Sequence, residues 1–168
     1  MRLLGILVAL SLSLRGTSAK DTSGPEISKH KFPAPPVNLF YFDDSETVVA
    51  LDPQHHNIWR STNAGEKWDK VDATNDEVVA VYPHPYDNKV AVALGGRRKH
   101  WITFDQGETW KQFVTKEHPT ERGDPLSFHA TDSKRILFHA ADDCLIFNIC
   151  VGKVCTATQL TSYVFQTC

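Results

Sequence analysis

The chain has 168 residues, a length that suits one domain of ordinary size, and 41% of its residues are apolar and 23% charged. This composition excludes a disordered or fibrous protein. The formal charge is −2, and no basic run extends beyond residues 96–100 (GRRKH), so a nucleic-acid partner is not expected, because phosphate binding needs a clustered positive surface.

Residues 1–19 have the features of a secretory signal peptide. Arg2 precedes an apolar run at 3–14 and small residues at 17–19, which predicts cleavage after Ala19. The alternative is a membrane anchor, but the run at 3–14 is shorter than the ~20 residues that cross a bilayer. Cleavage removes two of the 18 Lys and Arg and leaves the 20 Asp and Glu, so the formal charge becomes −4. We expect a soluble mature chain in the secretory lumen or outside the cell.

Residues 20–37 form an extended lead-in to the first predicted strand. Pro33, Pro35 and Pro36 argue against a helix there, because proline lacks the backbone N–H and restricts the residue before it.

Short runs of β-branched and aromatic residues follow, bounded by Asp, Asn, Gly and Pro, which predicts strands. The first four lie at 38–43, 47–52, 57–62 and 67–72, and the next four at 78–83, 89–95, 100–104 and 109–114. A third group begins with runs at 125–130 and 135–140. Four strands per unit, repeating about every 42 residues, are typical of a β-propeller. We therefore predict an all-β fold of about three blades.

The same turn joins the third and fourth predicted strands of both complete units. It has the form [Ser/Thr]-x-[Asn/Asp]-x-Gly-x-x-Trp, and its positions are Ser61, Asn63, Gly65 and Trp68 in one copy and Thr103, Asp105, Gly107 and Trp110 in the other. The Gly can adopt φ > 0, and the Asn or Asp oxygen can bind backbone N–H groups, joined by the hydroxyl. We expect the Trp to start the outer strand and to pack between the strands that the turn joins.

The offset of 42 residues between the two copies also relates other positions. It relates Trp59 to Trp101 and Val48 to Val90. Two matching turns at one period make a chance repeat a poor explanation.

The turn is identified as an Asp-box, also called a bacterial neuraminidase (BNR) repeat, which marks architecture more than chemistry. With the segments 35–52, 100–113 and 125–140, it resembles the luminal domain of the sortilin family, most of all the fungal vacuolar protein-sorting receptors, over residues 24–143. The resemblance implies that 38–143 is an incomplete part of a ten-bladed propeller. In receptors of this family, Cys-rich modules, one transmembrane helix and a cytoplasmic sorting tail follow the propeller.

The resemblance also implies a function. It implies a receptor that carries soluble hydrolases such as carboxypeptidase Y from the late Golgi to the endosome and vacuole. The receptor would touch the membrane only through its C-terminal parts, and it would have no catalytic residue, cofactor or metal.

The main alternative is a secreted sialidase or other Asp-box glycosidase. A sialidase needs clustered Arg residues and a Tyr nucleophile with its acid partner, and no Arg after residue 19 stands in an Arg-Ile-Pro context. The acid pairs Asp43–Asp44 and Asp142–Asp143 are interpreted as turn residues, since neighbours on a strand point to opposite faces. His55 and His56 occupy a predicted turn, and no carboxylate or Cys is expected at ligand spacing, so no metal site is predicted there. A receptor that releases cargo in an acidic endosome could use such His as pH switches, and the sequence singles out none of them.

Residues 144–168 depart from the pattern. A third copy of the turn is expected near 145–149 and is missing, so we interpret these residues as an atypical tail that arises from a frame or splice change or from a truncated gene. All four Cys lie in it: Cys144, Cys150, Cys155 and Cys168. Secretion favours disulfides over a zinc site, and three pairings remain open.

Overall fold

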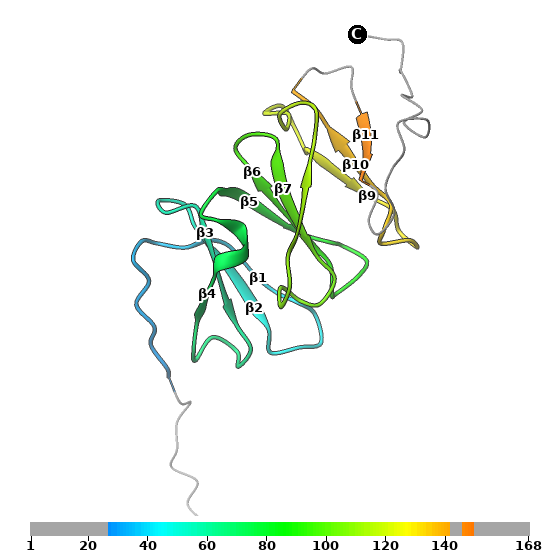
Figure 1. Ribbon diagram of the computed structural model, residues 1–168. Coiled ribbons are helices and arrows are strands. Elements are labelled where there is room, and N and C mark those ends of the chain that lie inside the picture. Colours follow the sequence, from blue (N-terminus) through cyan, green and yellow to red (C-terminus); the bar gives the residue numbers. More distant parts are fainter. Residues whose placement is uncertain (1–26, 142–145, 150–168) are drawn as a thin grey trace, which may run out of the picture.

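The structure is a computed structural model that describes residues 27–141 and 146–149. Within these residues it consists of three antiparallel β-sheets that follow one another in a row (Figure 1). The first sheet is built from β1 (Val37–Tyr41), β2 (Val48–Asp52), β3 (Asn57–Ser61) and β4 (Asp69–Val71). The second sheet is built from β5 (Val78–Pro83), β6 (Ala91–Gly95), β7 (Lys99–Thr103) and β8 (Lys111–Val114).

The third sheet contains β9, β10 and β11, with β10 in the middle. These strands span Leu126–Phe128, Ile136–His139 and Ile146–Ile149. The 3-10 turn η1 (Asp72–Thr74) joins the first two sheets and is the one helical element of the described residues. The all-β prediction is therefore confirmed, and so is the order of four consecutive strands in each of the first two sheets.

Each of the ten predicted strands has an observed counterpart, and two details differ from the expectation. Neither Trp68 nor Trp110 starts a strand, because β4 begins at Asp69 and β8 at Lys111. In addition, β11 pairs with β10 and completes the three-stranded sheet, although the sequence analysis assigned residues 146–149 to the tail. The sequence analysis assigned these residues to the tail because the turn motif is missing there. A strand can pair without that motif, because pairing needs only a short extended backbone.

The repeat is also less regular than the offset of 42 residues predicts. Trp59 pairs with Ala50 and Trp101 pairs with Ala93, so β2 and β6 are related by 43 residues. Val48 therefore corresponds to Ala91, and its predicted match with Val90 was wrong. The connection between β6 and β7 is one residue shorter than that between β2 and β3, and a Cβ on Gly95 would lie 2.4 Å from the Lys99 carbonyl oxygen.

The sheets pack face to face and bury two apolar clusters. Between the first two sheets, Val49, Leu51 and Ile58 meet Ala93 and Trp101. Between the second and third sheets, the buried residues are Val90, Val92, Leu94, Ile102, Leu126, Ile136, Phe138 and Ala140. Side chains alternate between the two faces of each strand, so the middle sheet contributes to both clusters.

The lead-in, of which the structure describes residues 27–36, has no helix in that part and packs against the first sheet, while Val37, the last residue of the predicted lead-in, already belongs to β1. The Phe32 ring lies 5.0 Å from the Trp68 ring and 5.9 Å from the Trp59 ring, measured between centroids. Ala34 is buried. The lead-in runs along the side of the first sheet that faces away from the second (Figure 1).

The predicted signal peptide (1–19) lies outside the described residues, and so do residues 20–26 of the lead-in. Within 27–141 and 146–149, no helix is long and apolar enough to cross a membrane.

Candidate functional site

The turn at 61–68 is organised by two side chains that bind its own backbone. The Ser61 hydroxyl accepts a hydrogen bond from the Gly65 N–H at 2.9 Å and donates one to Asn63 Oδ1 at 2.9 Å. Asn63 Oδ1 also accepts from the Lys67 N–H at 2.9 Å. Gly65 has φ +92°, in the region that favours glycine. The Trp68 indole N–H donates to the Gly65 carbonyl at 2.8 Å.

The turn at 103–110 repeats this arrangement atom for atom. Thr103 Oγ1 accepts from the Gly107 N–H at 2.8 Å and donates to Asp105 Oδ1 at 2.7 Å. Asp105 Oδ1 also accepts from the Thr109 N–H at 2.8 Å, and the Trp110 indole N–H donates to the Gly107 carbonyl at 3.1 Å. Gly107 has φ +78°. The predicted positions therefore do come together, and Asn63 supplies the same oxygen as Asp105.

Two features of these turns were not predicted. The residue before each Gly also has a positive φ: 53° at Ala64 and 58° at Gln106. Each indole N–H closes the turn on the Gly carbonyl, so the Trp has a polar role beside its packing. The spacing Gly-x-x-Trp contains this signal, because it places the indole over the carbonyl three residues before it.

The two Trp side chains differ in what covers them. Trp110 is 8% exposed and belongs to the apolar cluster between the first two sheets, together with Val49 and Ile58. This cluster contains residues of both sheets, so the cover of Trp110 is not limited to the strands that its own turn joins. Trp68 is partly exposed, and its neighbours include Phe32 and His30 of the lead-in.

Arg60 links the first sheet to the second turn. Its Nε–H donates to the Gln106 carbonyl at 2.8 Å, and its Cδ lies 3.4 Å from the position of a Cβ on Gly107. Thr47 adds a side-chain hydrogen bond to Gln106 at 3.4 Å. Sequence reasoning missed this contact. The sequence does contain a signal for this contact, because Arg60 stands at the position where the second repeat has the apolar Ile102.

The charge on Asp105 is stabilised within this network. Burial alone would raise the pKa of this carboxyl group, but hydrogen bonds from Thr109 and Thr103 and the nearby Arg60 guanidinium lower the pKa below its ordinary value. The Asp105 oxygens thus accept hydrogen bonds within their own turn and feel the charge of Arg60 on the neighbouring sheet, an arrangement that fixes the backbone of the turn.

The turn at 53–56 corrects one expectation about histidine. Nδ1 of His55 lies 2.8 Å from Oδ2 of the buried Asp52, although the sequence analysis expected no carboxylate near it. Oδ1 of Asp52 also accepts hydrogen bonds from the backbone N–H groups of Gln54 and His55, so the carboxylate stabilises the turn at 53–56. No group of three potential metal ligands occurs among the residues that the structure describes.

His100 is a buried histidine that sequence reasoning did not single out. Its Nδ1 accepts from the Gly95 N–H at 3.3 Å, and its Nε2 lies 2.9 Å from Thr115 Oγ1. The ring lies against Phe138 of the third sheet, 5.2 Å between centroids. Burial, with a smaller contribution from His118, lowers its pKa to about 4. His100 is therefore neutral at neutral pH, and its ring forms part of the contact between the second and third sheets.

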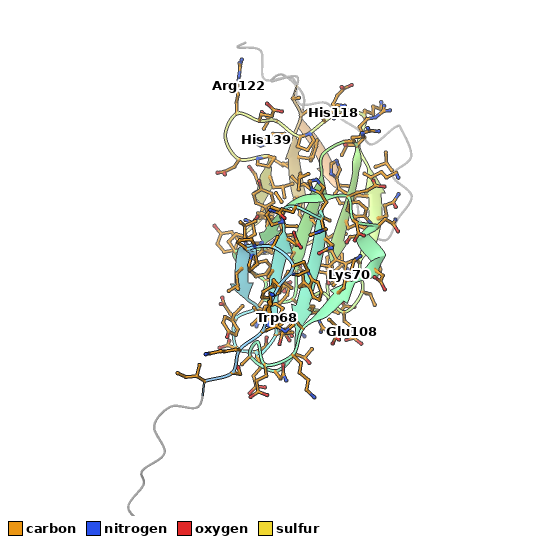
Figure 2. All side chains as sticks on the ribbon, turned by 90° about the vertical axis from the view of Figure 1, so that its left-hand side faces the viewer. Trp68, Lys70, Glu108, His118, Arg122 and His139 are labelled. Atoms are coloured by element: carbon orange, nitrogen blue, oxygen red, sulfur yellow. The ribbon has the colours of Figure 1, made fainter. Side chains whose placement is uncertain are left out.

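A pocket of about 590 Å³ lies between the second sheet and the connection that leads to the third. Its lining includes Val79, Tyr82 and Leu94 on one side and His118 and Arg122 on the other. Figure 2 shows His118 and Arg122 near the opposite end of the molecule from Trp68 and Glu108. The volume is in the range of ligand pockets, but none of the predicted site residues lines it.

One serine–histidine contact also occurs, and it is exposed. Ser127 Oγ lies 3.2 Å from Nε2 of His139 on the neighbouring strand. Within the described residues no carboxylate hydrogen-bonds to this histidine, so the contact lacks the third group of a hydrolytic triad. Asp43 and Asp44 lie in the turn after β1, as expected. Asp142, Asp143 and the possible disulfide residues, Cys144, Cys150, Cys155 and Cys168, lie outside the described residues.

Comparison with known proteins adds a family and several relatives. The Sortilin-Vps10 family model, described as "Sortilin, neurotensin receptor 3", matches residues 56–165. The chain is 43% identical over 143 residues to the vacuolar protein sorting/targeting protein 10 of Phaeosphaeria nodorum, covering 85% of this chain and 10% of that protein. It is 38% identical over 159 residues to the protein of the same name from Uncinocarpus reesii, covering 92% and 10%.

The chain thus spans about a tenth of the length of the curated relatives it matches. The family match runs through residue 165 and so includes most of the segment interpreted as an atypical tail. Among solved structures, an ancestral GH74 enzyme superposes with a TM-score of 0.51 at 10% identity, covering 68% of this chain and 17% of that one. This likeness concerns the fold alone.

Proposed function

The chain belongs to the sortilin–Vps10 family, and we propose that it is the N-terminal part of the luminal domain of a sorting receptor that binds soluble vacuolar hydrolases. The observation that carries this proposal is the identity of 35–43% with proteins named for vacuolar sorting and targeting, over most of the chain. The receptor would carry its cargo, such as carboxypeptidase Y, from the late Golgi to the endosome and vacuole.

The chain is a sorting-receptor segment and not an enzyme. Its relatives are named for sorting, and the GH74 enzyme shares the fold at an identity too low to carry an activity. The alternative of a secreted glycosidase therefore has no support in the comparisons. The family membership supports a binding function. Binding another protein needs a rigid scaffold with an exposed surface, and it needs no catalytic groups.

In this proposal the two repeated turns are Asp-boxes with an architectural role. Ser61, Asn63 and Gly65 would fix the backbone of one turn, and Thr103, Asp105 and Gly107 that of the other. The hydrogen bonds support this role, because the side-chain oxygens bind their own turn and both indoles close on a Gly carbonyl. Their expected contribution is to hold each blade rigid and at a fixed angle to its neighbour.

The domain division also belongs to the proposal. Residues 1–19 would direct the chain into the secretory pathway as a signal peptide, 20–37 would be the lead-in, and 38–143 the propeller part. Residues 144–168, with Cys144, Cys150, Cys155 and Cys168, would form disulfides in the oxidising lumen. The membrane contact would come from C-terminal parts of a longer receptor.

The test is the fate of a vacuolar hydrolase in cells that lack the gene for this chain. We expect carboxypeptidase Y to appear in the culture medium instead of the vacuole, and an intact copy of the gene to restore its retention. The matched control is a hydrolase that reaches the vacuole as a membrane protein, whose sorting should not change. Retention of carboxypeptidase Y in the deleted cells would contradict the proposal.

A further inference from the structure

A second hollow adjoins the pocket that lies between the second sheet and the connection to the third. It has a volume of about 550 Å³, and charged side chains line it, among them Asp76, Glu77 and Arg97. Val79 and Gly96 line both hollows, so the two form one groove that passes across the start of β5. We call it the β5 groove. Each of its two parts has a volume in the range of ligand sites.

The β5 groove lies at the end of the molecule opposite the repeated turns. Arg97 belongs to the connection that precedes β7, whereas the turn at 103–110 follows β7, so the two lie at opposite ends of one strand. Figure 2 shows the same separation, with His118 of the groove near one end of the molecule and Trp68 near the other. A ligand in the groove can therefore bind without touching the repeated turns.

Hydrogen bonds hold both walls of the β5 groove in place. On the side of the first sheet, the Val78 N–H donates to the His56 carbonyl at 2.9 Å, and His56 Nδ1 lies 3.3 Å from the Val78 carbonyl oxygen. On the side of the third sheet, the Thr120 N–H donates to the His139 carbonyl at 3.0 Å. The walls are thus ordered before a ligand arrives, which lowers the entropic cost of binding.

The centre of the β5 groove is apolar and open. Val79 is 46% exposed, and Tyr82 and Leu94 line the groove beside it. A Cβ on Gly96 would lie 3.2 Å from Val79 Cγ1, which is closer than ordinary van der Waals contact. The glycine therefore leaves the space that the Val79 side chain needs. An apolar side chain of a ligand that enters here covers apolar surface that water now contacts.

The charges in the groove near Val79 are unequally neutralised. Asp76 Oδ2 lies 2.8 Å from Lys70 Nζ, and Glu77 Oε1 lies 3.2 Å from Lys99 Nζ, so both acids have a basic partner. Arg97 is exposed, and in the part of the chain that the structure describes it has no ion-pair partner. A guanidinium group can bind a carboxylate through two parallel hydrogen bonds. The groove therefore favours a ligand with a carboxylate at this place.

We propose that the β5 groove binds an extended segment of a partner protein in which an apolar side chain stands next to carboxylates. The apolar side chain lies on Val79 and Leu94, and a carboxylate binds Arg97. At the far end of the groove, Glu121 and Arg122 carry opposite charges and add no net charge. An extended segment fits better than a compact small molecule, because the groove runs from the first sheet to the connection before the third. This inference rests on the proposed function, which makes the partner a protein.

The experiment measures the binding of labelled peptides to a longer chain of the receptor that contains these residues. One fluorescein-labelled probe is Gly-Ser-Asp-Leu-Asp-Gly-Ser, the second has Lys in place of both Asp, and the third has Ser in place of Leu. Fluorescence polarisation gives the dissociation constant of each probe for the unaltered chain and for Arg97→Glu and Val79→Ser. The matched control is Lys111→Glu, which makes the same change in charge at an exposed position next to the turn at 103–110.

We expect the acidic–apolar peptide to bind at least about ten-fold more tightly than the basic peptide, because a hydrogen bond between charged groups contributes that much. Arg97→Glu should weaken its binding by at least about ten-fold, and Lys111→Glu should leave it unchanged. Val79→Ser should remove the preference for the peptide with Leu over the peptide with Ser.

Three results would overturn the proposal. They are equal affinities for the acidic and basic peptides, no binding of any peptide, and the same loss of affinity in Arg97→Glu and Lys111→Glu, which would reflect net charge alone. None of these results depends on where carboxypeptidase Y goes in cells that lack the gene, so the site can be refuted while the sorting function stands.

Discussion

Replacing each of the two indoles by alanine should reveal how much of the stability comes from contact between sheets. Trp110 is 8% exposed and lies in the cluster between the first and second sheets, whereas Trp68 is partly exposed and lies against Phe32 and His30 of the lead-in. We expect Trp110→Ala to lower the free energy of unfolding by about 4–5 kcal/mol and Trp68→Ala by about 2–3 kcal/mol.

These magnitudes follow from burial and one hydrogen bond. A buried Trp removes up to about 250 Å² from water, which at about 25 cal/mol per Å² approaches 6 kcal/mol before any relaxation of the surroundings. Each substitution also leaves a Gly carbonyl without the indole N–H, at a cost of about 1 kcal/mol. Trp110→Ala should cost more because the packed residues of the first sheet cannot move in to fill the cavity that the missing ring leaves.

The assay is urea denaturation followed by far-UV circular dichroism, on a longer chain of the receptor that contains these residues and folds cooperatively. Far-UV detection avoids the change in fluorescence that loss of a Trp causes. Asp105→Asn is the control, because Asn63 makes the equivalent hydrogen bonds in the other turn, and it should cost much less than either Trp variant. Equal costs for the two Trp variants would refute the role given to the first sheet, and an Asp105→Asn cost as large as that of Trp110→Ala would refute the division of work within the turn.

Three further predictions concern contacts between sheets and the isolated chain. Arg60→Met keeps an aliphatic stem but loses the hydrogen bond to the Gln106 carbonyl, so it should lower the free energy of unfolding by about 1–2 kcal/mol in the same assay. The control Arg97→Met, at an exposed position, should lower it by less than about 0.5 kcal/mol. Equal losses for the two variants would contradict the link between Arg60 and the second turn. The pKa of His100 is lowered from 6.5 to about 4, so the unfolded chain binds the proton more readily, and stability should fall by up to about 3 kcal/mol as the pH drops from 6.5 to 4. His100→Gln should flatten that part of the profile of urea midpoint against pH, and an unchanged slope would exclude His100 as its source. When this chain is expressed for secretion it should associate or be retained, because Leu39, Tyr41 and Leu137 are exposed on sheet faces of the described part of the chain, and a sharp monomer peak with a cooperative melt on size exclusion and heating would contradict this.

The sequence predicted the strands well because each is short, apolar and bounded by residues that form turns. The repeated turns were predicted for the same reason: local groups such as Ser61 and Asn63 determine their hydrogen bonds. The offset of 43 residues between β2 and β6 was not predicted, because it depends on the shorter connection after Gly95. The offset of 42 residues between Trp59 and Trp101 does not reveal that the connection between β6 and β7 is one residue shorter than that between β2 and β3.

Contacts between sheets were harder to predict than contacts within them. The cover of Trp110 by the first sheet, the Arg60 link and the packing of Phe32 on Trp68 all join residues that are far apart in the chain. Each depends on which face of a strand meets which neighbour, and strand patterns leave that open when both faces are apolar. The buried His100 belongs to the same class, because its environment comes from Phe138 of the third sheet.

The most direct measurement for the proposed function is binding between the receptor to which these residues belong and a vacuolar hydrolase. A chain of the receptor that contains these residues is immobilised and presented with purified carboxypeptidase Y precursor, with the mature enzyme of the same organism as the matched control. The account predicts saturable binding of at least one vacuolar hydrolase precursor and no turnover of any glycoside by the same protein. Hydrolysis of a glycoside, or the absence of binding to every vacuolar hydrolase of that organism, would contradict it.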